Sequence, residues 1–167
     1  PIVVNSWVDS VFAEIHRVEE MATDYNDTSE VGRINATAGT ESVTVSSELI
    51  VLLRRGLHYG EVSHRAFDVA IGPIVKAWDF LSPDPHSPSK GKIAALLPLI
   101  NPQLISIVGN KVYLREEGMG IDLGGIAKGY AVDRSAEVLL RGGFKRFIID
   151  IGGNLGVYWD GTNMLDS

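Results

Sequence analysis

The stretch GMGIDLGGIAKGYAVD, residues 118–133, holds five glycines, two aspartates and one lysine. Its pattern predicts a strand ending at Asp122, a Gly-Gly turn and a helix beginning near Ile126. The free N–H groups at a helix start attract anions, and Lys128 adds a cation in the first turn. The spacing matches neither G-x-G-x-x-G nor the P-loop. The stretch is therefore either a phosphate site or a tight turn in which Asp122 caps the helix; its residue types leave both open.

The composition is that of an ordinary folded domain. A chain of 167 residues, 45% hydrophobic and 22% charged, is long enough to build a core. The net charge of -6 argues against a nucleic-acid partner, because such binding needs clustered Lys and Arg. The absence of cysteine excludes disulfides, thiolate catalysis and zinc-thiolate sites. We therefore expect one domain covering residues 1–167.

Periodicity and turn residues predict both helices and strands along the chain. Helices are expected over residues 5–22 (capped by Asn5 or Ser6), 46–64 and 90–99, from Pro73 onward and after the Gly-Gly turn, with a helical turn at 30–34. Strands are expected at 42–45, within 65–72, in a hairpin over 104–114 and in a strand with a turn over 144–159. The expected fold class is α/β, an α+β mixed sheet with packed helices, with a βαβ-like unit around residues 118–133.

Three other side chains are candidates for a ligand site, each with a structural alternative. Asp68, before a Gly-Pro corner, either hydrogen-bonds a ligand or caps a turn. Tyr25, in a polar loop, either stacks on a planar ligand or only packs. Asp150, at the end of an apolar strand, either reaches a site at a sheet edge or caps the Gly-Gly turn that follows. The four histidines show no metal-ligand spacing, and no G-x-S-x-G nucleophile is present.

Four stretches, in chain order, resemble motifs of the ApbE family, the FAD:protein FMN transferases. They are YNDTSEVGRIN (25–35), RAFDVAIGPIVKAWDF (65–80), IDLGGIAKGYAVD (121–133) and IIDIGGN (148–154). The third is similar to the family signature almost residue for residue. The resemblance extends over most of the chain and implies an ApbE-like fold.

The resemblance also implies a chemistry and a set of site residues. Members bind FAD, cleave its pyrophosphate with Mg²⁺ and attach FMN to a threonine of a target flavoprotein. Tyr25 would lie at the flavin side of the pocket, and the main-chain carbonyl of Gly125 would be a magnesium ligand. The positions that would contact FAD are Tyr25, Ala66, Phe67, Asp68, Asp122 and Lys128. No residue is assigned a catalytic role.

The resemblance leaves alternatives open for the activity. A flavin-binding protein without transfer activity, or an FAD pyrophosphatase giving FMN and AMP, would use the same pocket. Because family members are longer, we expect this chain to be truncated at both ends and to cover the N-terminal and central part of the fold. The resemblance implies a periplasmic or membrane-tethered location, with membrane contact only through a lipid anchor absent from this sequence.

Overall fold

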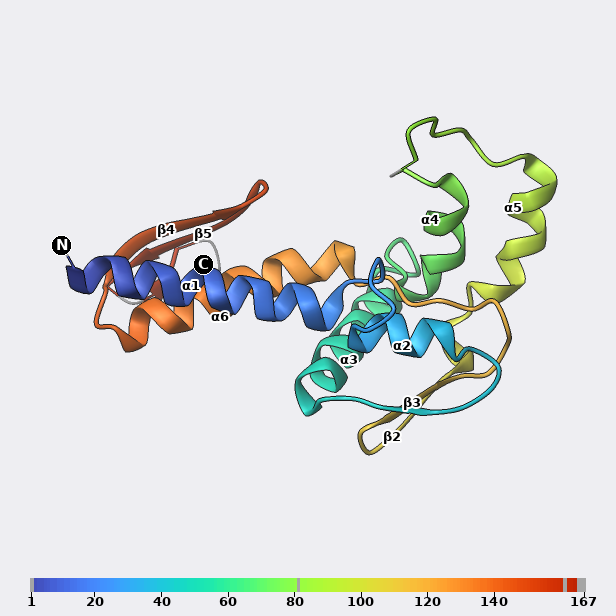
Figure 1. Ribbon diagram of the computed structural model, residues 1–167, viewed down its shortest axis with the longest axis horizontal. Coiled ribbons are helices and arrows are strands. Elements are labelled where there is room, and N and C mark those ends of the chain that lie inside the picture. Colours follow the sequence, from blue (N-terminus) through green and yellow to red (C-terminus); the bar gives the residue numbers. More distant parts are fainter. Residues whose placement is uncertain (1, 81, 161, 165–167) are drawn as a thin grey trace. The chain divides into compact units, whose positions relative to one another are not determined.

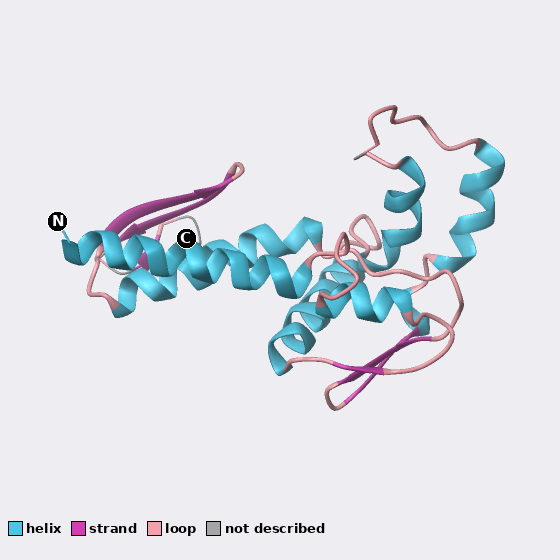
Figure 2. Cartoon of the chain, in the orientation of Figure 1, coloured by secondary structure: helices cyan, strands magenta, loops and turns pink. Residues whose placement is uncertain are grey.

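The computed structural model describes residues 2–80, 82–160 and 162–164 (Figure 1). Its contacts divide the chain into two compact units. Unit 1 comprises Pro1–Glu20 and Gly124–Ser167, and unit 2 comprises Met21–Leu123. Both units contain helices and strands (Figure 2), which confirms the expected mixed fold class. The prediction of a single domain over residues 1–167 is not tested by this division and stays a prediction.

Unit 2 combines four α-helices with a small antiparallel sheet. The helices are α2 (Glu30–Ala36), α3 (Ser47–Val62), α4 (Gly72–Trp78) and α5 (Lys90–Leu96). The strands are β1 (Val43–Thr44), β2 (Ile105–Val108) and β3 (Lys111–Leu114), in the order β1-β3-β2. Short 3-10 turns lie at Val69–Ile71, Leu97–Leu99 and Pro102–Leu104. Its fully buried side chains include Ile34, Leu49, Leu52, Leu53, Leu114 and Ile121.

Local sequence signals explain how several elements of unit 2 begin and turn. The side chain of Ser46 accepts a hydrogen bond from the backbone N–H of Leu49 (3.1 Å), as expected for a serine that caps α3. Pro73 lies in the first turn of α4, where its missing N–H costs nothing. Gly109, with φ 57°, begins the tight turn of the β2–β3 hairpin. The predicted helices and hairpin of this unit are therefore confirmed.

Unit 1 packs the long helix α6 against a second antiparallel sheet. It contains α1 (Ile2–Ala22, within the unit as far as Glu20), α6 (Gly124–Arg141), β4 (Arg146–Ile151), β5 (Asn154–Trp159) and β6 (Thr162–Asn163). The sheet order is β4-β5-β6. The core between helix and sheet is formed by Val132, Ala136, Ile149 and Tyr158. None of the helices in the described part of the chain is both long and apolar enough to cross a membrane.

The two glycine pairs of unit 1 stop a helix and turn a hairpin, as predicted. Gly143, with φ 80°, follows α6, and the N–H of Phe144 donates to the carbonyl of Leu139 (3.1 Å), as in a Schellman motif. Gly152 and Gly153 have φ values of 57° and 87° and connect β4 to β5. The carboxylate of Asp150 accepts from the N–H of Gly153 (2.8 Å), so its turn-capping role is confirmed.

Three local predictions are wrong around residues 118–133. Residues 119–123 form no strand, and α6 begins at Gly124, so the two glycines belong to its first turn. The expected βαβ-like unit is absent from the described residues, because β3, the strand before α6, belongs to a different sheet from β4, and β4 pairs antiparallel with β5. The apolar residues of 119–123 are buried by contacts other than a strand ladder, and this is why their hydrophobicity was misleading.

Two further boundaries differ from the sequence prediction. The segment from Asp68 to Gly72 forms a 3-10 turn in place of a strand, because the Asp68 side chain accepts from the N–H of Ala70 (2.9 Å) and starts that turn. Helix α1 begins at Ile2, so Asn5 and Ser6 lie inside it and cap nothing. Both residue types are tolerated within a helix at a small cost, and they therefore do not mark its start here.

Candidate functional site

A cavity of about 450 Å³ lies within unit 2. Three stretches of the chain line it: residues 24–36, residues 72–80 and residues 118–120. These stretches belong to, or directly precede, the first three of the four motifs that carry the resemblance. A volume of this size is typical of small-molecule sites. The cavity is therefore the candidate functional site of unit 2.

The loop that carries Tyr25 is fixed against the start of α2. The Ser29 hydroxyl accepts from the N–H of Gly32 (2.8 Å) and donates to the carbonyl of Thr23 (2.5 Å). A Cβ atom at Gly32 would collide with the carbonyl oxygen of Asn26, so only glycine allows the loop to lie so close to the helix. Tyr25 projects from this fixed loop with 68% of its surface exposed.

Near its C-terminal end, α2 makes hydrogen bonds to residues 119–123, the segment before α6. The amide of Asn35 donates to the carbonyl of Ile121 (2.9 Å), and its oxygen accepts from the N–H of the same residue (2.7 Å). The next N–H, that of Asp122, donates to the carbonyl of Val69 (2.9 Å). Segment 119–123 is therefore fixed by one side chain and by the 3-10 turn at Val69–Ile71.

Two glycines bring the second motif into backbone contact with the residues just before the third motif. A Cβ atom at Gly72 would lie 2.8 Å from the carbonyl carbon and oxygen of Gly120. Both residues are buried, and both line the cavity. The glycine of the Gly-Pro corner is therefore required for this close approach. Because neither glycine has a side chain, peptide groups form this part of the cavity wall.

The cavity is acidic, with one lysine near its carboxylates. It is lined by Asp24, Asp27, Asp79 and Lys76. Burial raises the pKa of the Asp24 carboxyl, the charge of Asp122 raises it further, and Lys76 opposes this effect. Partial desolvation and the charges of Asp24 and Asp122 also raise the pKa of the Tyr25 phenol. Tyr25 thus remains a neutral phenol at physiological pH.

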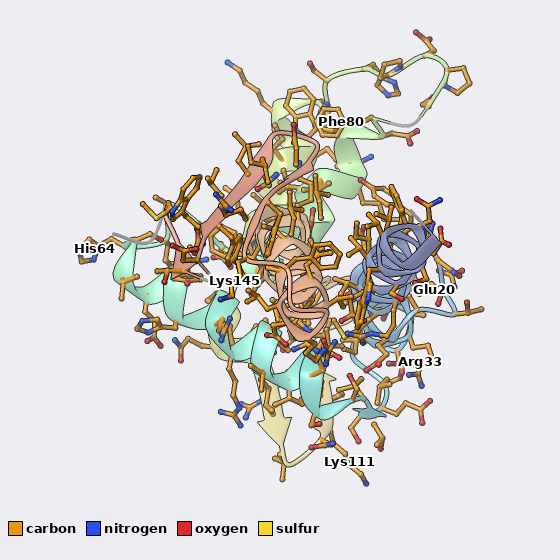
Figure 3. All side chains as sticks on the ribbon, turned by 90° about the vertical axis from the view of Figure 1, so that its left-hand side faces the viewer. Glu20, Arg33, His64, Phe80, Lys111 and Lys145 are labelled. Atoms are coloured by element: carbon orange, nitrogen blue, oxygen red, sulfur yellow. The ribbon has the colours of Figure 1, made fainter. Side chains whose placement is uncertain are left out.

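Two aromatic side chains follow one another at the end of α4. Trp78 and Phe80 stack almost in parallel, with ring centroids 5.7 Å apart and an interplanar angle of 4°. The residue between them, Asp79, has left-handed backbone angles (φ 48°, ψ 50°), which reverses the chain direction. Phe80, which follows α4 and is labelled in Figure 3, is one of the residues that line the cavity. Phe80 was not among the residues predicted from the sequence; its signal there was an aromatic pair at the end of the Gly-Pro helix.

The Ala66–Asp68 segment is not part of the lining of this cavity. Asp68 lines a second cavity of about 500 Å³ in unit 2. Both of its carboxylate oxygens are engaged, one by the N–H of Ala70 and the other by the guanidinium of Arg65 (2.6 Å). The structure thus confirms the turn-capping role of Asp68. The assignment of Ala66, Phe67 and Asp68 to FAD stays a prediction.

The remaining predicted residues lie on either side of the boundary between the units. Asp122 belongs to unit 2, and its charge acts on the two cavity residues Asp24 and Tyr25. Gly125 and Lys128 lie in the first turns of α6, in unit 1, and both are exposed. The structure thus brings Tyr25 and Asp122 into electrostatic range of each other, and the roles of Gly125 and Lys128 stay predictions.

The described residues do not by themselves fit a magnesium ion. Among them, no three His, Cys, Asp or Glu side chains gather closely enough to hold a metal. Magnesium prefers an octahedral shell of oxygen atoms. The carbonyl of Gly125 is one oxygen, and it lies within α6, where carbonyls accept hydrogen bonds from the following turn. We therefore assign no chemical step to a metal.

The fold is shared with solved flavin transferases. The flavin transferase ApbE from Vibrio cholerae matches with a TM-score of 0.84 at 24% identity, covering 92% of this chain and 50% of that one. The flavinyl transferase ApbE from Pseudomonas stutzeri, in its apo form, matches with a TM-score of 0.82 at 26% identity, covering 95% and 54%. These likenesses define the class of fold.

The chain belongs to the ApbE family, whose sequence model matches residues 2–163. A FAD:protein FMN transferase from Klebsiella pneumoniae (strain 342) is 36% identical over 147 residues, which are 87% of this chain and 46% of the relative. Another from Treponema pallidum (strain Nichols) is 30% identical over 159 residues, 91% of this chain and 44% of the relative. The chain thus spans slightly less than half the length of these relatives.

Proposed function

We propose that the protein containing this chain is a FAD:protein FMN transferase, which cleaves FAD and transfers its FMN part to a target flavoprotein. The observation that carries this proposal is the cavity of unit 2, whose lining comes from the family's tyrosine loop, its Gly-Pro segment and the residues just before its signature. Relatives that bear this name match most of the chain. Binding of FAD by the chain's own residues is the first requirement of this function.

The chain's own residues would bind and orient the substrate. We propose that Tyr25 contacts the flavin end of FAD, and that Lys128 contacts the molecule through its charge. Phosphoryl transfer depends mainly on positioning and on neutralising the charge of the pyrophosphate. The first turns of α6, where Gly124, Gly125 and Lys128 lie, combine the positive end of a helix dipole with a cation, which suits an anion.

Three finer points rest on the resemblance alone. The acceptor is a threonine of the target protein. A magnesium ion, with the carbonyl of Gly125 as one ligand, would stabilise the charge of the pyrophosphate when bound. The protein is located outside the cytoplasm, either periplasmic or tethered to a membrane, which fractionation of cells would test. Each of these points can fail without removing the flavin cavity.

The activity can be tested with the full-length protein. Incubation with FAD, MgCl₂ and a threonine-bearing flavoprotein target should release AMP and give a fluorescent flavin that stays on the target in a denaturing gel. Controls omit the target, replace FAD with riboflavin, or add EDTA. FAD that stays intact in the complete mixture would refute the transferase. Release of FMN and AMP without the target would instead identify a pyrophosphatase, and FAD binding without AMP a flavin-binding protein.

A further inference from the structure

We propose that Phe80, together with Tyr25, stacks on the planar heteroaromatic ring of the ligand that enters the unit 2 cavity, and that Trp78 positions Phe80 for this contact. The inference rests on the proposed function, because FAD supplies the ring. Both Phe80 and Tyr25 line the cavity, from the two chain segments 72–80 and 24–36.

The exposure of the two aromatic rings is the first observation. Phe80 is 62% exposed and Tyr25 is 68% exposed. Leaving aromatic surface in water forgoes the free energy that its burial would release. A planar ligand that covers both rings recovers that free energy, and aromatic stacking adds to it. Exposed aromatic side chains at a cavity are therefore better explained by a ring that binds there than by packing.

Phe80 is held in position by the ring of Trp78 and by hydrogen bonds of the neighbouring backbone. The half-buried Trp78 stacks on Phe80 almost in parallel, at 5.7 Å between centroids. The backbone on both sides of Asp79 is also fixed, because its N–H donates to the carbonyl of Lys76 (3.3 Å) and its carbonyl accepts from the N–H of Ser82 (2.9 Å). Phe80 is thus held in place before any ligand binds, which lowers the entropy cost of stacking.

The charge of the cavity distinguishes a ring from a phosphate. Three aspartates, Asp24, Asp27 and Asp79, line it together with a single lysine, Lys76. These carboxylates repel a pyrophosphate but act little on an uncharged ring. The peptide groups at Gly72 and Gly120 add a wall without side chains, against which a flat ring can lie. The cavity therefore fits the ring end of FAD.

The test compares matched variants of the full-length protein by calorimetry with FAD. Phe80→Leu keeps an apolar side chain but removes the ring, and it should weaken FAD binding about tenfold. Phe80→Tyr keeps the ring and should bind within about twofold of wild type, since stacking is retained. Phe12→Leu, at an aromatic residue of α1 that is 57% exposed, is the control and should bind as wild type.

Two further measurements identify the ring and the role of Trp78. Riboflavin and AMP carry the flavin and the adenine ring separately, so the ligand whose binding Phe80→Leu weakens identifies the ring. Trp78→Leu should weaken the same ligand, and Trp78→Phe should restore its binding, without a change in melting temperature. A general structural defect would instead lower the melting temperature and weaken both ligands.

The outcomes separate this inference from the proposed function. If wild-type protein binds no FAD, the proposed function fails. If wild type binds FAD and Phe80→Leu binds it equally well, the stacking role of Phe80 is refuted while the proposed function stands. Selective weakening of riboflavin supports the inference, whereas selective weakening of AMP would place Phe80 on the adenine ring and overturn its joint stacking with Tyr25.

Discussion

The side chain of Asn35 makes the two backbone hydrogen bonds that a neighbouring strand would otherwise make. Its amide makes two hydrogen bonds to the backbone of Ile121, a residue 86 positions away, as a neighbouring strand would. Ile121 is fully buried, so its N–H and carbonyl have no access to water. The last residue of the tyrosine-loop motif thus fixes the segment that leads into the signature.

Replacing Asn35 with alanine should destabilise the protein by about 2–3 kcal/mol, because two buried backbone groups lose their partners. Urea unfolding followed by circular dichroism measures the change. Asn5→Ala, at an exposed position of α1, is the control and should change stability by less than about 0.5 kcal/mol. Equal stability of the Asn35 variant and wild type would show that the two hydrogen bonds are unimportant.

Gly32 of α2 and Gly129 of α6 both lie inside a helix, but the two glycines have different roles. Gly32 of α2 lies against the backbone of Asn26 and permits the tyrosine loop to fold back. Gly129 of α6 has no atom within 4 Å of the position that a Cβ would occupy. The same residue type is thus required in one helix and replaceable in the other.

Gly32→Ala should therefore cost about 3 kcal/mol or more, since the loop has to move away from α2. Gly129→Ala should instead stabilise the protein by about 0.5–1 kcal/mol, because alanine loses less backbone entropy in a helix. Thermal and urea unfolding of both variants give the comparison. A similar effect of the two changes would contradict the assigned role of Gly32.

Within unit 1, the Glu14 carboxylate of α1 pairs with Arg17 of the same helix (2.8 Å) and with Arg134 of α6 (3.2 Å). The hydrogen bond from Arg17, helped by Arg134 and opposed by burial, lowers the pKa of Glu14 from 4.5 to about 2. A carboxyl whose pKa is lower in the folded state stabilises that state above its unfolded pKa. This stabilisation is lost as the pH falls through the folded value.

We therefore expect Glu14 to contribute about 2 kcal/mol at neutral pH, and to lose this contribution as the pH falls from about 4.5 to about 2. Glu14→Gln should be less stable than wild type at pH 7, and the difference should shrink towards pH 2. Glu20→Gln, at an exposed residue of the same helix, is the control. A difference between Glu14→Gln and wild type that is independent of pH would exclude a role for the charge.

On the scale of the whole molecule, the predicted FAD residues are distributed over both units. Tyr25 and Asp122 belong to unit 2, and Lys128 belongs to unit 1. If Lys128 contacts FAD, Lys128→Ala should weaken FAD binding about tenfold or more, as expected for a lost hydrogen bond to a charged group. Lys145→Ala, at another exposed lysine of unit 1, should bind as wild type. Calorimetry at one ionic strength provides the measurement, and equal affinities would remove Lys128 from the site.

The sequence predicted most elements, because their signals are local. Serine caps, Pro73 and the glycine pairs act on backbone within a few residues, and they placed α3, α4, the end of α6 and both hairpins correctly. It failed at residues 119–123 and 65–72, where buried apolar residues resemble a strand. The backbone there is held by the Asn35 side chain and by the 3-10 turn in place of a strand ladder, and periodicity does not reveal either.

The sequence alone determined the mixed fold class and the family, since the motif residues and their order are visible without coordinates. It also indicated Tyr25 as a ligand contact. Only the tertiary structure revealed that the tyrosine loop, the Gly-Pro segment and residues 118–120 line one cavity in unit 2, that Asp68 lines a separate cavity, and that Phe80 is supported by Trp78. The physical reason is the separation along the sequence of the residues that interact. Caps and turns depend on residues a few positions apart. A cavity depends on contacts between distant residues, such as Asn35 with Ile121, which exist only in the folded chain.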